Sequence, residues 1–272
     1  MNFTSAAIIV TYNPDITILD EFIEILLPQV TQVLIVDNSE PAKVLDYPGV
    51  EVIQLNDNVG IAAAQNLGVQ KAIDKGYDFV FTFDQDSRIA STFCRDMIEE
   101  YQRYEQQYPI ACLGPAINQQ PQNKGLIEKD FIISSGALFP LQAFKDVGLF
   151  KSEWFIDMID VEWSYRARTK GLLSFESTRV LMHHNIGEND YPRLFNREVR
   201  IGSPVRQYYL VRNWIFSLKS ESFTTKYKFY ILTLILRKIP LFALLAPRKT
   251  RIKFIMQGLR DGIMGKGGKY SS

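Results

Sequence analysis

The sequence has few of the residues that define disulfide-rich or metal-thiolate proteins. Its 272 residues include two cysteines, Cys94 and Cys112, and two histidines, His183 and His184. Two cysteines are too few for a disulfide framework, and each is expected to be a small buried apolar side chain. The N-terminus has no basic segment followed by an apolar one, so we expect no export signal. These absences favour a protein of the reducing cytoplasm.

Long apolar runs and phosphate-binding glycine motifs are also missing. The apolar stretch 227–246 is interrupted by Arg237, Lys238 and Pro240, so neither piece approaches the ~20 residues that span a bilayer. No Gly-x-Gly-x-x-Gly or Gly-x-x-x-x-Gly-Lys loop follows the first expected strand, 6–12. This disfavours the mononucleotide-binding folds that hold phosphates with those loops.

Net charge is small but unevenly distributed. The whole chain carries +1, whereas residues 205–272 hold 14 Lys and Arg against two acids, a net +12 that leaves −11 for residues 1–204. A basic segment rich in apolar residues is typical of helices that lie on an anionic membrane surface. Binding of nucleic acid is the weaker alternative, because no recognition motif accompanies the basic residues.

Apolar strand-length runs alternate with helical patterns along the first half of the chain. Strands are expected at 6–12, 33–36, 50–55, 79–83, 109–115 and 131–139, helices at 16–27, 60–75 and 92–108, and a loop at 118–130. This alternation predicts an α/β fold with a mostly parallel sheet. The carboxyl ends of its strands then share one edge, where such sheets bind ligands.

The strand at 79–83 ends in two carboxylates, Asp84 and Asp86. Two acids spaced i and i+2 at one edge of a sheet suit Mg²⁺ or Mn²⁺, which leave coordination positions open for phosphate oxygens. An ordinary surface turn is the alternative reading, because Asp and Ser are common turn residues.

Small and amide side chains recur in the helix expected at 60–75. Gly60, Ala64 and Gly68 form a smooth ridge beside Gln65 and Asn66, whose amides are able to read a nucleobase or ribose edge. Packing explains the same ridge equally well. Asn58, just before the helix, is expected to be its N-cap.

Two later segments combine polar groups with apolar surroundings. Ser135 and Gly136 interrupt an apolar strand, which indicates either an opening for an acceptor or a β-bulge. Asp157, Asp160 and Glu162 lie among aromatic residues, where a carboxyl group could acquire the pKa of a general base. A helix cap with ion pairs is the alternative for these three acids.

An ordered set of motifs resembles the inverting glycosyltransferases of family 2, which have the GT-A fold, and most of all the bacterial rhamnosyltransferases of O-antigen and capsule assembly. The resemblance runs from Ala7 to about Trp214. It rests on Val10-Thr11-Tyr12-Asn13-Pro14, Val36-Asp37-Asn38-Ser39, Asn58-Val59-Gly60-Ile61-Ala62-Ala63-Ala64-Gln65-Asn66-Leu67-Gly68, Phe83-Asp84-Gln85-Asp86-Ser87 and Asp157-Met158-Ile159-Asp160-Val161-Glu162-Trp163.

The resemblance implies a Rossmann-like catalytic domain over 1–204, with a nucleotide-binding half (about 1–115) and an acceptor half (about 116–204). A basic amphipathic helical region, 205–272, would associate with the membrane. It also implies roles for individual residues. The nucleotide would contact Thr11, Tyr12, Asn13, Asp37, Asn58, Gly60, Asn66 and Asp84; the metal Asp84, Asp86 and His184; and the acceptor Ser135, Gly136, Asp157 and Glu162.

Asp160 matches the catalytic aspartate of the family's Glu-Asp motif. Ile159 stands where the family usually has Glu, so Asp157 and Glu162 remain alternatives for the general base.

The implied activity is metal-dependent transfer, with inversion, of L-rhamnose from dTDP-β-L-rhamnose to a lipid-linked oligosaccharide. The setting would be lipopolysaccharide, O-antigen or capsule biosynthesis, at the cytoplasmic face of the cell membrane, without nucleic acid; a homo-oligomer stays open. Alternatives are a UDP-sugar donor, or a non-catalytic sugar-nucleotide-binding protein at the membrane. A processive synthase is disfavoured, because Gln207, Arg212 and Trp214 do not have the spacing of its Gln-x-x-Arg-Trp signature.

Overall fold

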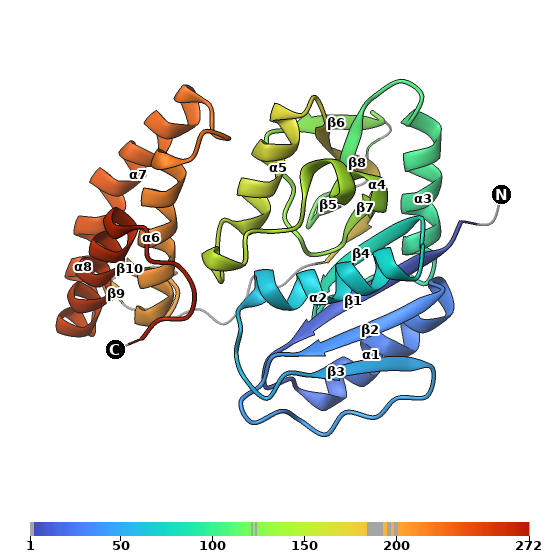
Figure 1. Ribbon diagram of the computed structural model, residues 1–272, viewed down its shortest axis with the longest axis horizontal. Helices are drawn as coiled ribbons and strands as arrows, with labels where there is room; N and C mark the ends of the chain where they lie inside the picture. Colours follow the sequence, from blue (N-terminus) through green and yellow to red (C-terminus); the bar gives the residue numbers. More distant parts are fainter. Residues whose placement is uncertain are drawn as a thin grey trace.

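The computed structural model describes residues 3–120, 122, 124–183, 193–194, 197–198 and 201–271. One eight-stranded sheet organises most of them (Figure 1). Its strands, in spatial order, are β3 (Val50–Gln54), β2 (Gln32–Asp37), β1 (Ser5–Thr11), β4 (Phe79–Asp84), β7 (Ala137–Pro140), β5 (Ile110–Ile117), β8 (Leu173–Met182) and β6 (Leu126–Lys129). A separate two-stranded pair joins β9 (Arg193–Leu194) and β10 (Arg197–Glu198).

The sheet is mostly parallel, which confirms the expected α/β fold. Strands β3, β2, β1 and β4 are parallel neighbours, and β5 is parallel to β8. Only β7, between β4 and β5, and β6, at the edge beside β8, run antiparallel to their neighbours. The antiparallel β7 therefore begins at the edge where β4 ends.

Helices cover both faces of the sheet. They are α1 (Ile16–Leu26), α2 (Ile61–Asp74), α3 (Phe93–Tyr104), α4 (Leu141–Val147) and α5 (Ile159–Thr169), with short 3₁₀ turns η1 (Leu27–Gln29) and η2 (Ser152–Trp154). Side chains of a strand alternate between the two faces. Accordingly, Ala6 and Ile8 of β1 pack in the cluster that includes α2, α4 and α5, whereas Ala7 and Ile9 pack in the cluster of α1 and α3. Cys94 and Cys112 are buried and unbonded to each other, as expected.

Two expectations about the middle of the chain were wrong. The strand expected at 131–139 begins only at Ala137, and the loop expected at 118–130 contains β6. The backbone before β7 instead turns across the sheet edge, with Gly136 at φ +72°, where an added Cβ would lie 2.3 Å from the Met182 sulfur. Strand β6 is short, and its side chains are not fully buried, so it lacks the apolar pattern of a central strand.

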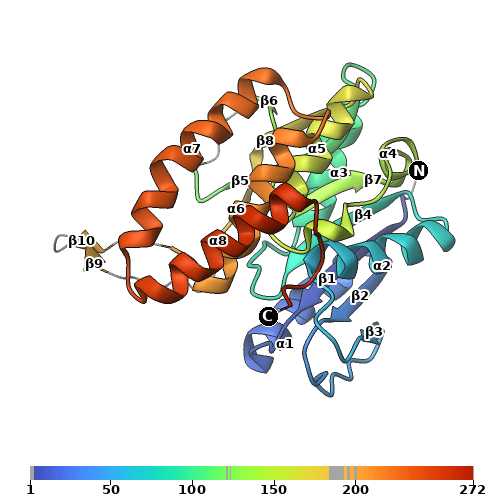
Figure 2. The same ribbon diagram turned by 60° about the vertical axis from the view of Figure 1, so that its left-hand side comes forward.

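Three further helices follow the sheet: α6 (Pro204–Lys219), α7 (Thr225–Leu244) and α8 (Arg248–Met264). Figures 1 and 2 show them together on one side of the sheet, next to α5. They share an apolar cluster that includes Val211, Trp214, Ile231, Phe242 and Ile255. Within the described part of the chain, no helix combines the length and hydropathy needed to cross a membrane.

Candidate active site

Three strand ends bring polar side chains to one edge of the sheet. Thr11 ends β1, Asp37 ends β2 and Asp84 ends β4. Thr11 lies opposite Asp37 in the register of the sheet, and Val10 lies opposite Asp84. The edge is therefore lined by residues from motifs far apart in the sequence.

Asp37 organises the turn that follows β2. Its side chain is fully buried, and Oδ1 accepts hydrogen bonds from Thr11 Oγ1 (2.9 Å), Ser39 N (3.2 Å) and Ser39 Oγ (2.6 Å), while Oδ2 accepts from Lys43 N (2.7 Å). Hydrogen bonds to an ionised carboxylate are stronger than neutral ones. The carboxylate thus joins the end of β1 to the loop after β2, and a direct nucleotide contact by Asp37 stays a prediction.

Tyr12 and Asn13 continue this wall beyond β1. The Tyr12 side chain is 50% exposed, and its backbone N donates to Gln85 Oε1 at 2.7 Å. Asn13 N donates to Ser39 Oγ at 2.7 Å. These bonds tie the loops after β1, β2 and β4 to one another and leave the Tyr12 ring at the surface of the edge.

The loop before α2 approaches the same region. Asn58 Oδ1 accepts from Asn38 Nδ2 (3.0 Å) and from Gly60 N (3.1 Å). Gly60, rather than Asn58, is the N-cap of α2. Its φ of +89° and the 2.6 Å that would separate an added Cβ from Phe155 O explain why only glycine fits there.

Asn66 and the ridge of small residues on α2 make contacts with other parts of the protein. Asn66 Nδ2 donates to Phe150 O (2.7 Å) and Ser152 Oγ (3.0 Å), and Oδ1 accepts from Phe150 N (2.9 Å). Gly68 packs against Ile8 of β1, where an added Cβ would lie 2.7 Å from that side chain. This geometry favours the packing explanation of the ridge, and a nucleotide contact by Asn66 stays a prediction.

Asp84 and Asp86 are half-buried at the end of β4. In the described part of the chain, no three acids, histidines or cysteines form a metal-binding cluster, and His184 lies outside the described residues. The donor set at this edge is a pair of carboxylates. That set fits Mg²⁺ or Mn²⁺ when phosphate oxygens and water complete the coordination.

Asp160 lies in the first turn of α5, against the loop that leads into β7. Ser134 N donates to Asp160 Oδ2 at 3.3 Å and Val161 N to Oδ1 at 2.8 Å. Burial raises the pKa of Asp160 to about 6; backbone hydrogen bonds oppose this rise, and the charge of Asp157 adds to it. A carboxyl group with this pKa is ionised at neutral pH and is more basic than an ordinary aspartate.

The loop 134–136 connects Asp160 with the edge of the sheet. Gly136 N donates to Thr82 O (2.8 Å), Thr82 Oγ1 donates to Ser134 O, and the Ser135 and Ser87 hydroxyls lie 3.3 Å apart. Thr82 and Ser87 flank the carboxylates that end β4. The structure thus brings Asp160, Ser135 and Gly136 to the same edge as Asp84.

The other two acids of the cluster are in ion pairs. Glu162 is fully buried, with Oε1 3.1 Å from Lys151 Nζ and Oε2 3.1 Å from Arg166 Nη2. Asp157 pairs with Arg206, whose Nη2 lies 2.9 Å from Oδ1. For Glu162 this geometry favours the structural alternative over an acceptor contact.

Arg206 is a candidate site residue that sequence reasoning missed. Its pKa is raised chiefly by the charge of Asp157, against burial, and the charge of Asp84 adds to the effect. Arg206 therefore pairs its positive charge with Asp157 and is close enough to Asp84 to feel the charge of that carboxylate. Nothing in the local sequence marks it, because it is one of 14 basic residues in the segment 205–272.

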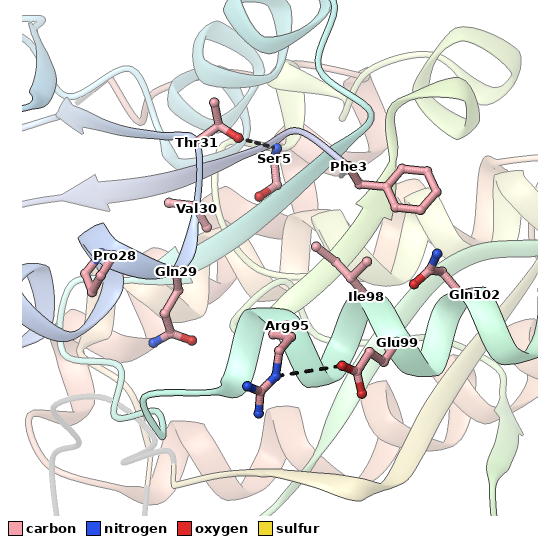
Figure 3. A pocket seen from close by; sticks show the side chains of 10 residues that line it. All are labelled: Phe3, Ser5, Pro28, Gln29, Val30, Thr31, Arg95, Ile98, Glu99 and Gln102. Carbon is pink, nitrogen blue, oxygen red and sulfur yellow. Dashed lines mark hydrogen bonds and ion pairs between the residues drawn. The ribbon is translucent and has the colours of Figure 1, made fainter. Parts of the chain in front are cut away.

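Two hollows have very different surroundings. A cavity of about 540 Å³ lies between the start of α5 and helices α6 and α7, and Asp157 and Arg206 are among its lining residues. A second, of about 470 Å³, lies at the opposite edge of the sheet, near Ser5 and Thr31 (Figure 3). An ion pair between Arg95 and Glu99 lies on its wall. No residue predicted for the site lines that second hollow.

Known proteins resemble this chain in sequence and in fold. The family model described as glycosyl transferase family 2 matches residues 6–146. The dTDP-rhamnosyl transferase RfbF of Shigella flexneri is 30% identical over an alignment 303 positions long, which covers all of both chains.

Solved structures share the fold. TarS 1–349 of S. aureus matches with a TM-score of 0.58 at 15% identity, over 97% of this chain and 83% of that one. The same protein in complex with UDP-GlcNAc matches with a TM-score of 0.59 at 16% identity, over 97% and 81%. GalNAc-T7 with UDP, GalNAc and Mn²⁺ matches with a TM-score of 0.58 at 12% identity, over 96% and 56%.

Proposed function

This chain belongs to the family 2 glycosyltransferases, and we propose that it transfers L-rhamnose from dTDP-β-L-rhamnose to a lipid-linked saccharide with inversion. Whole-chain likeness to a protein named a dTDP-rhamnosyl transferase supports this donor. We assign residues 1–204 to the catalytic domain and residues 205–272 to a helical region that contacts the membrane.

The environment of Asp160 is the observation that best supports an enzymatic role. An acceptor hydroxyl is a poor nucleophile, so a base must take its proton as its oxygen attacks the anomeric carbon. Asp160 has a pKa of about 6 because it is buried, and Ser134 N holds its carboxylate toward the edge of the sheet. It is therefore the residue that we assign as general base.

The donor would lie along the loops that follow β1, β2 and β3. Thr11, Tyr12, Asn13 and Asp37 would form one wall of the nucleoside pocket, and Asn58, Gly60 and Asn66 the other. Asp84 and Asp86 would hold Mg²⁺ or Mn²⁺ next to the diphosphate, with Arg206 adding positive charge nearby. When bound, the ion supplies Lewis-acid stabilisation of charge on the departing diphosphate; the GalNAc-T7 structure, solved with UDP and Mn²⁺ together, supports this choice.

The reaction is a single displacement. The acceptor oxygen bonds to the anomeric carbon while that carbon's bond to the diphosphate oxygen breaks, and the hydroxyl proton passes to Asp160. Attack from the face opposite the leaving group converts the β-linked donor into an α-L-rhamnoside. Holding both substrates in line removes much of the entropic barrier, and no covalent enzyme intermediate is needed.

The exposed surface of α7 and α8 supports peripheral binding to the cytoplasmic face of the membrane, where a lipid-linked acceptor would be presented. Apolar side chains are exposed on one face of each helix: Phe229, Leu232 and Leu236 on α7, and Ile252, Met256 and Ile263 on α8. The segment 205–272 also carries +12. Apolar burial and attraction to anionic lipids together hold such helices at an interface.

A transfer assay tests the proposal. Purified protein is given dTDP-β-L-rhamnose, Mg²⁺ and lipid-linked saccharides from a strain that lacks this chain and so accumulates its acceptor. The wild type should form a rhamnosylated product, and Asp160→Asn should lower kcat by about 10²- to 10⁴-fold while its dTDP affinity, measured by calorimetry, changes less than about twofold. If product formed only with a UDP-sugar, the donor would be that sugar nucleotide and not dTDP-β-L-rhamnose. Nucleotide binding without turnover would indicate a non-catalytic binder.

A further inference from the structure

The proposed function assigns no role to the apolar residues that line the cavity between α5, α6 and α7. Its lining is mainly apolar and aromatic, and includes Met158, Val161, Leu210, Trp214, Tyr227 and Phe242. Three of its lining residues, Asp157, Met158 and Val161, lie within three positions of Asp160 in the sequence. Its volume, about 540 Å³, is in the range of pockets that hold small ligands.

Gln207 is a buried polar residue in the wall of this cavity whose side-chain amide has no hydrogen-bond partner among the described residues. It lies on α6, is only 2% exposed, and lines the cavity. Neither its Nε2 nor its Oε1 has a hydrogen-bond partner among the described residues. Burying an amide without hydrogen bonds is unfavourable, so a ligand that satisfies both atoms would account for its position.

We propose that this cavity is the acceptor subsite and that it holds the terminal saccharide of the acceptor, bonded through its hydroxyls to Gln207. The inference rests on the proposed function. A sugar ring presents an apolar face of C–H groups, which suits Trp214 and Tyr227, and hydroxyls that both donate and accept. The Asp157–Arg206 ion pair forms a further polar edge of the same cavity.

The polar groups distinguish a saccharide from a lipid chain. An isoprenoid or acyl chain in the cavity would leave both Gln207 atoms unsatisfied, whereas a hydroxylated ring would satisfy them. The lipid portion of the acceptor would then extend toward the exposed apolar faces of α7 and α8. A hydroxyl held beside Asp157 and Met158 would lie close to the general base, Asp160.

Gln207→Met tests the contact, because methionine has nearly the same length and volume but forms no comparable hydrogen bonds. We expect the KM for the accumulated lipid-linked acceptor to rise about tenfold, with the KM for dTDP-β-L-rhamnose unchanged. The melting temperature should not fall, because an unpaired buried amide is removed. Gln142→Met, on the exposed surface of α4 and bonded to Asp146, is the matched control and should retain every wild-type value.

A second acceptor separates saccharide from lipid as the occupant. With the saccharide released from its lipid carrier, Gln207→Met should raise KM by the same factor; a rise confined to the lipid-linked form would show that lipid fills the cavity. Leu210→Trp, which narrows the cavity, should also raise the acceptor KM. Wild-type KM values in both variants would overturn the proposal while leaving the transferase assignment intact, since a failed assignment would appear as no transfer by the wild type.

Discussion

The carboxyl group of Asp160 is governed by burial more than by neighbouring charge. Desolvation disfavours the ionised form and raises its pKa to about 6, although backbone N–H groups of Val161 and Ser134 oppose the rise. At neutral pH the residue is ionised, and because its pKa is raised the carboxylate is basic enough to accept a proton from a hydroxyl in the transition state.

The rate of transfer should therefore follow the ionisation of Asp160. Below pH 6, kcat/KM should fall about tenfold for each pH unit, because the protonated carboxyl cannot act as a base; above about pH 7 it should be level. Initial rates between pH 5 and 8.5 measure this. A midpoint near pH 4, the usual value for aspartate, would contradict the assignment of the base.

The same pKa makes a prediction for stability. The folded state binds the Asp160 proton more tightly than the unfolded state, so the wild type loses stability as pH rises from about 4 to about 6. Asp160→Asn escapes this loss and should be more stable at pH 7.5 by on the order of 2 kcal/mol, with the difference vanishing near pH 4. Urea unfolding at both pH values tests it; a less stable variant at pH 7.5 would contradict the account.

The paired carboxylates at the end of β4 make a metal prediction. EDTA should abolish transfer by the wild type, and Asp86→Asn should raise the Mg²⁺ or Mn²⁺ concentration for half-maximal activity at least tenfold, because one of two anionic ligands is neutralised. The stabilisation that Mn²⁺ adds to the dTDP complex in a melting experiment should shrink in parallel. Asp74→Asn, at an exposed position of α2, is the control; full activity of the wild type in EDTA would exclude the metal role.

At the scale of secondary structure, α6 holds the loop that precedes α5. Asn213 Nδ2 donates to the carbonyls of Trp154 (3.0 Å), Ile156 (2.8 Å) and Asp157 (2.9 Å). Buried Arg212 donates to Trp154 O at 2.9 Å and to Gly268 O at 2.7 Å. In this loop Phe155, Asp157 and Met158 all have positive φ, a conformation that persists only when its surroundings enforce it.

Removing that support should weaken both the fold and the site. Asn213→Ala removes the side-chain donor to the carbonyls of Ile156 and Asp157, whereas Trp154 O keeps its bond from Arg212, so the free energy of unfolding should fall by about 2–3 kcal/mol. The kcat for transfer should also fall, because Asp160 follows this loop directly. Urea unfolding and transfer kinetics measure the two effects, with Gln102→Ala on the exposed side of α3 as control; unchanged values for Asn213→Ala would show that the loop holds its conformation unaided.

At the scale of the whole molecule, the C-terminal region is integrated with the sheet rather than appended to it. After α8 the chain returns to the loops beyond β2 and β3, where Lys269 Nζ lies 2.7 Å from Glu40 Oε2 and 2.6 Å from Asp57 Oδ1. Asp261 of α8 accepts a hydrogen bond from the buried Tyr208 hydroxyl at 2.8 Å. Deleting residues 222–272 would remove these partners, so membrane binding is better tested by surface substitution.

Substitutions on the exposed apolar face of α7 and α8 test membrane binding. Leu236, 74% exposed, and Met256, 61% exposed, would enter the lipid interface, and replacing both with Asp adds charge where apolar burial is needed. Sedimentation with vesicles containing anionic phosphatidylglycerol should fall at least tenfold. Val44→Asp, at a 93% exposed position beyond β2, should sediment like the wild type; equal loss in this control, or none in the double variant, would contradict an interfacial role for these helices.

Local sequence determined most of the strands and helices of this protein, and the polar residues that end β1, β2 and β4. Apolar runs such as 79–83 are buried wherever they lie, and the acids that follow them must remain at the edge. Because β1, β2 and β4 are parallel, Thr11, Asp37 and Asp84 meet at one edge of the sheet. This can be predicted without knowing any contact between distant segments.

Only the tertiary structure decided what those residues touch. The antiparallel insertion of β7, the pairing of Asp157 with Arg206 and the burial of Gln207 all depend on contacts between segments distant in the chain. A basic or amide residue looks the same in sequence whether it meets solvent or a carboxylate, because its partner is set by packing. The sequence by itself thus determined at which edge of the sheet the polar side chains gather, because they follow parallel strands, and packing of the helices against that edge decided which side chains face each other.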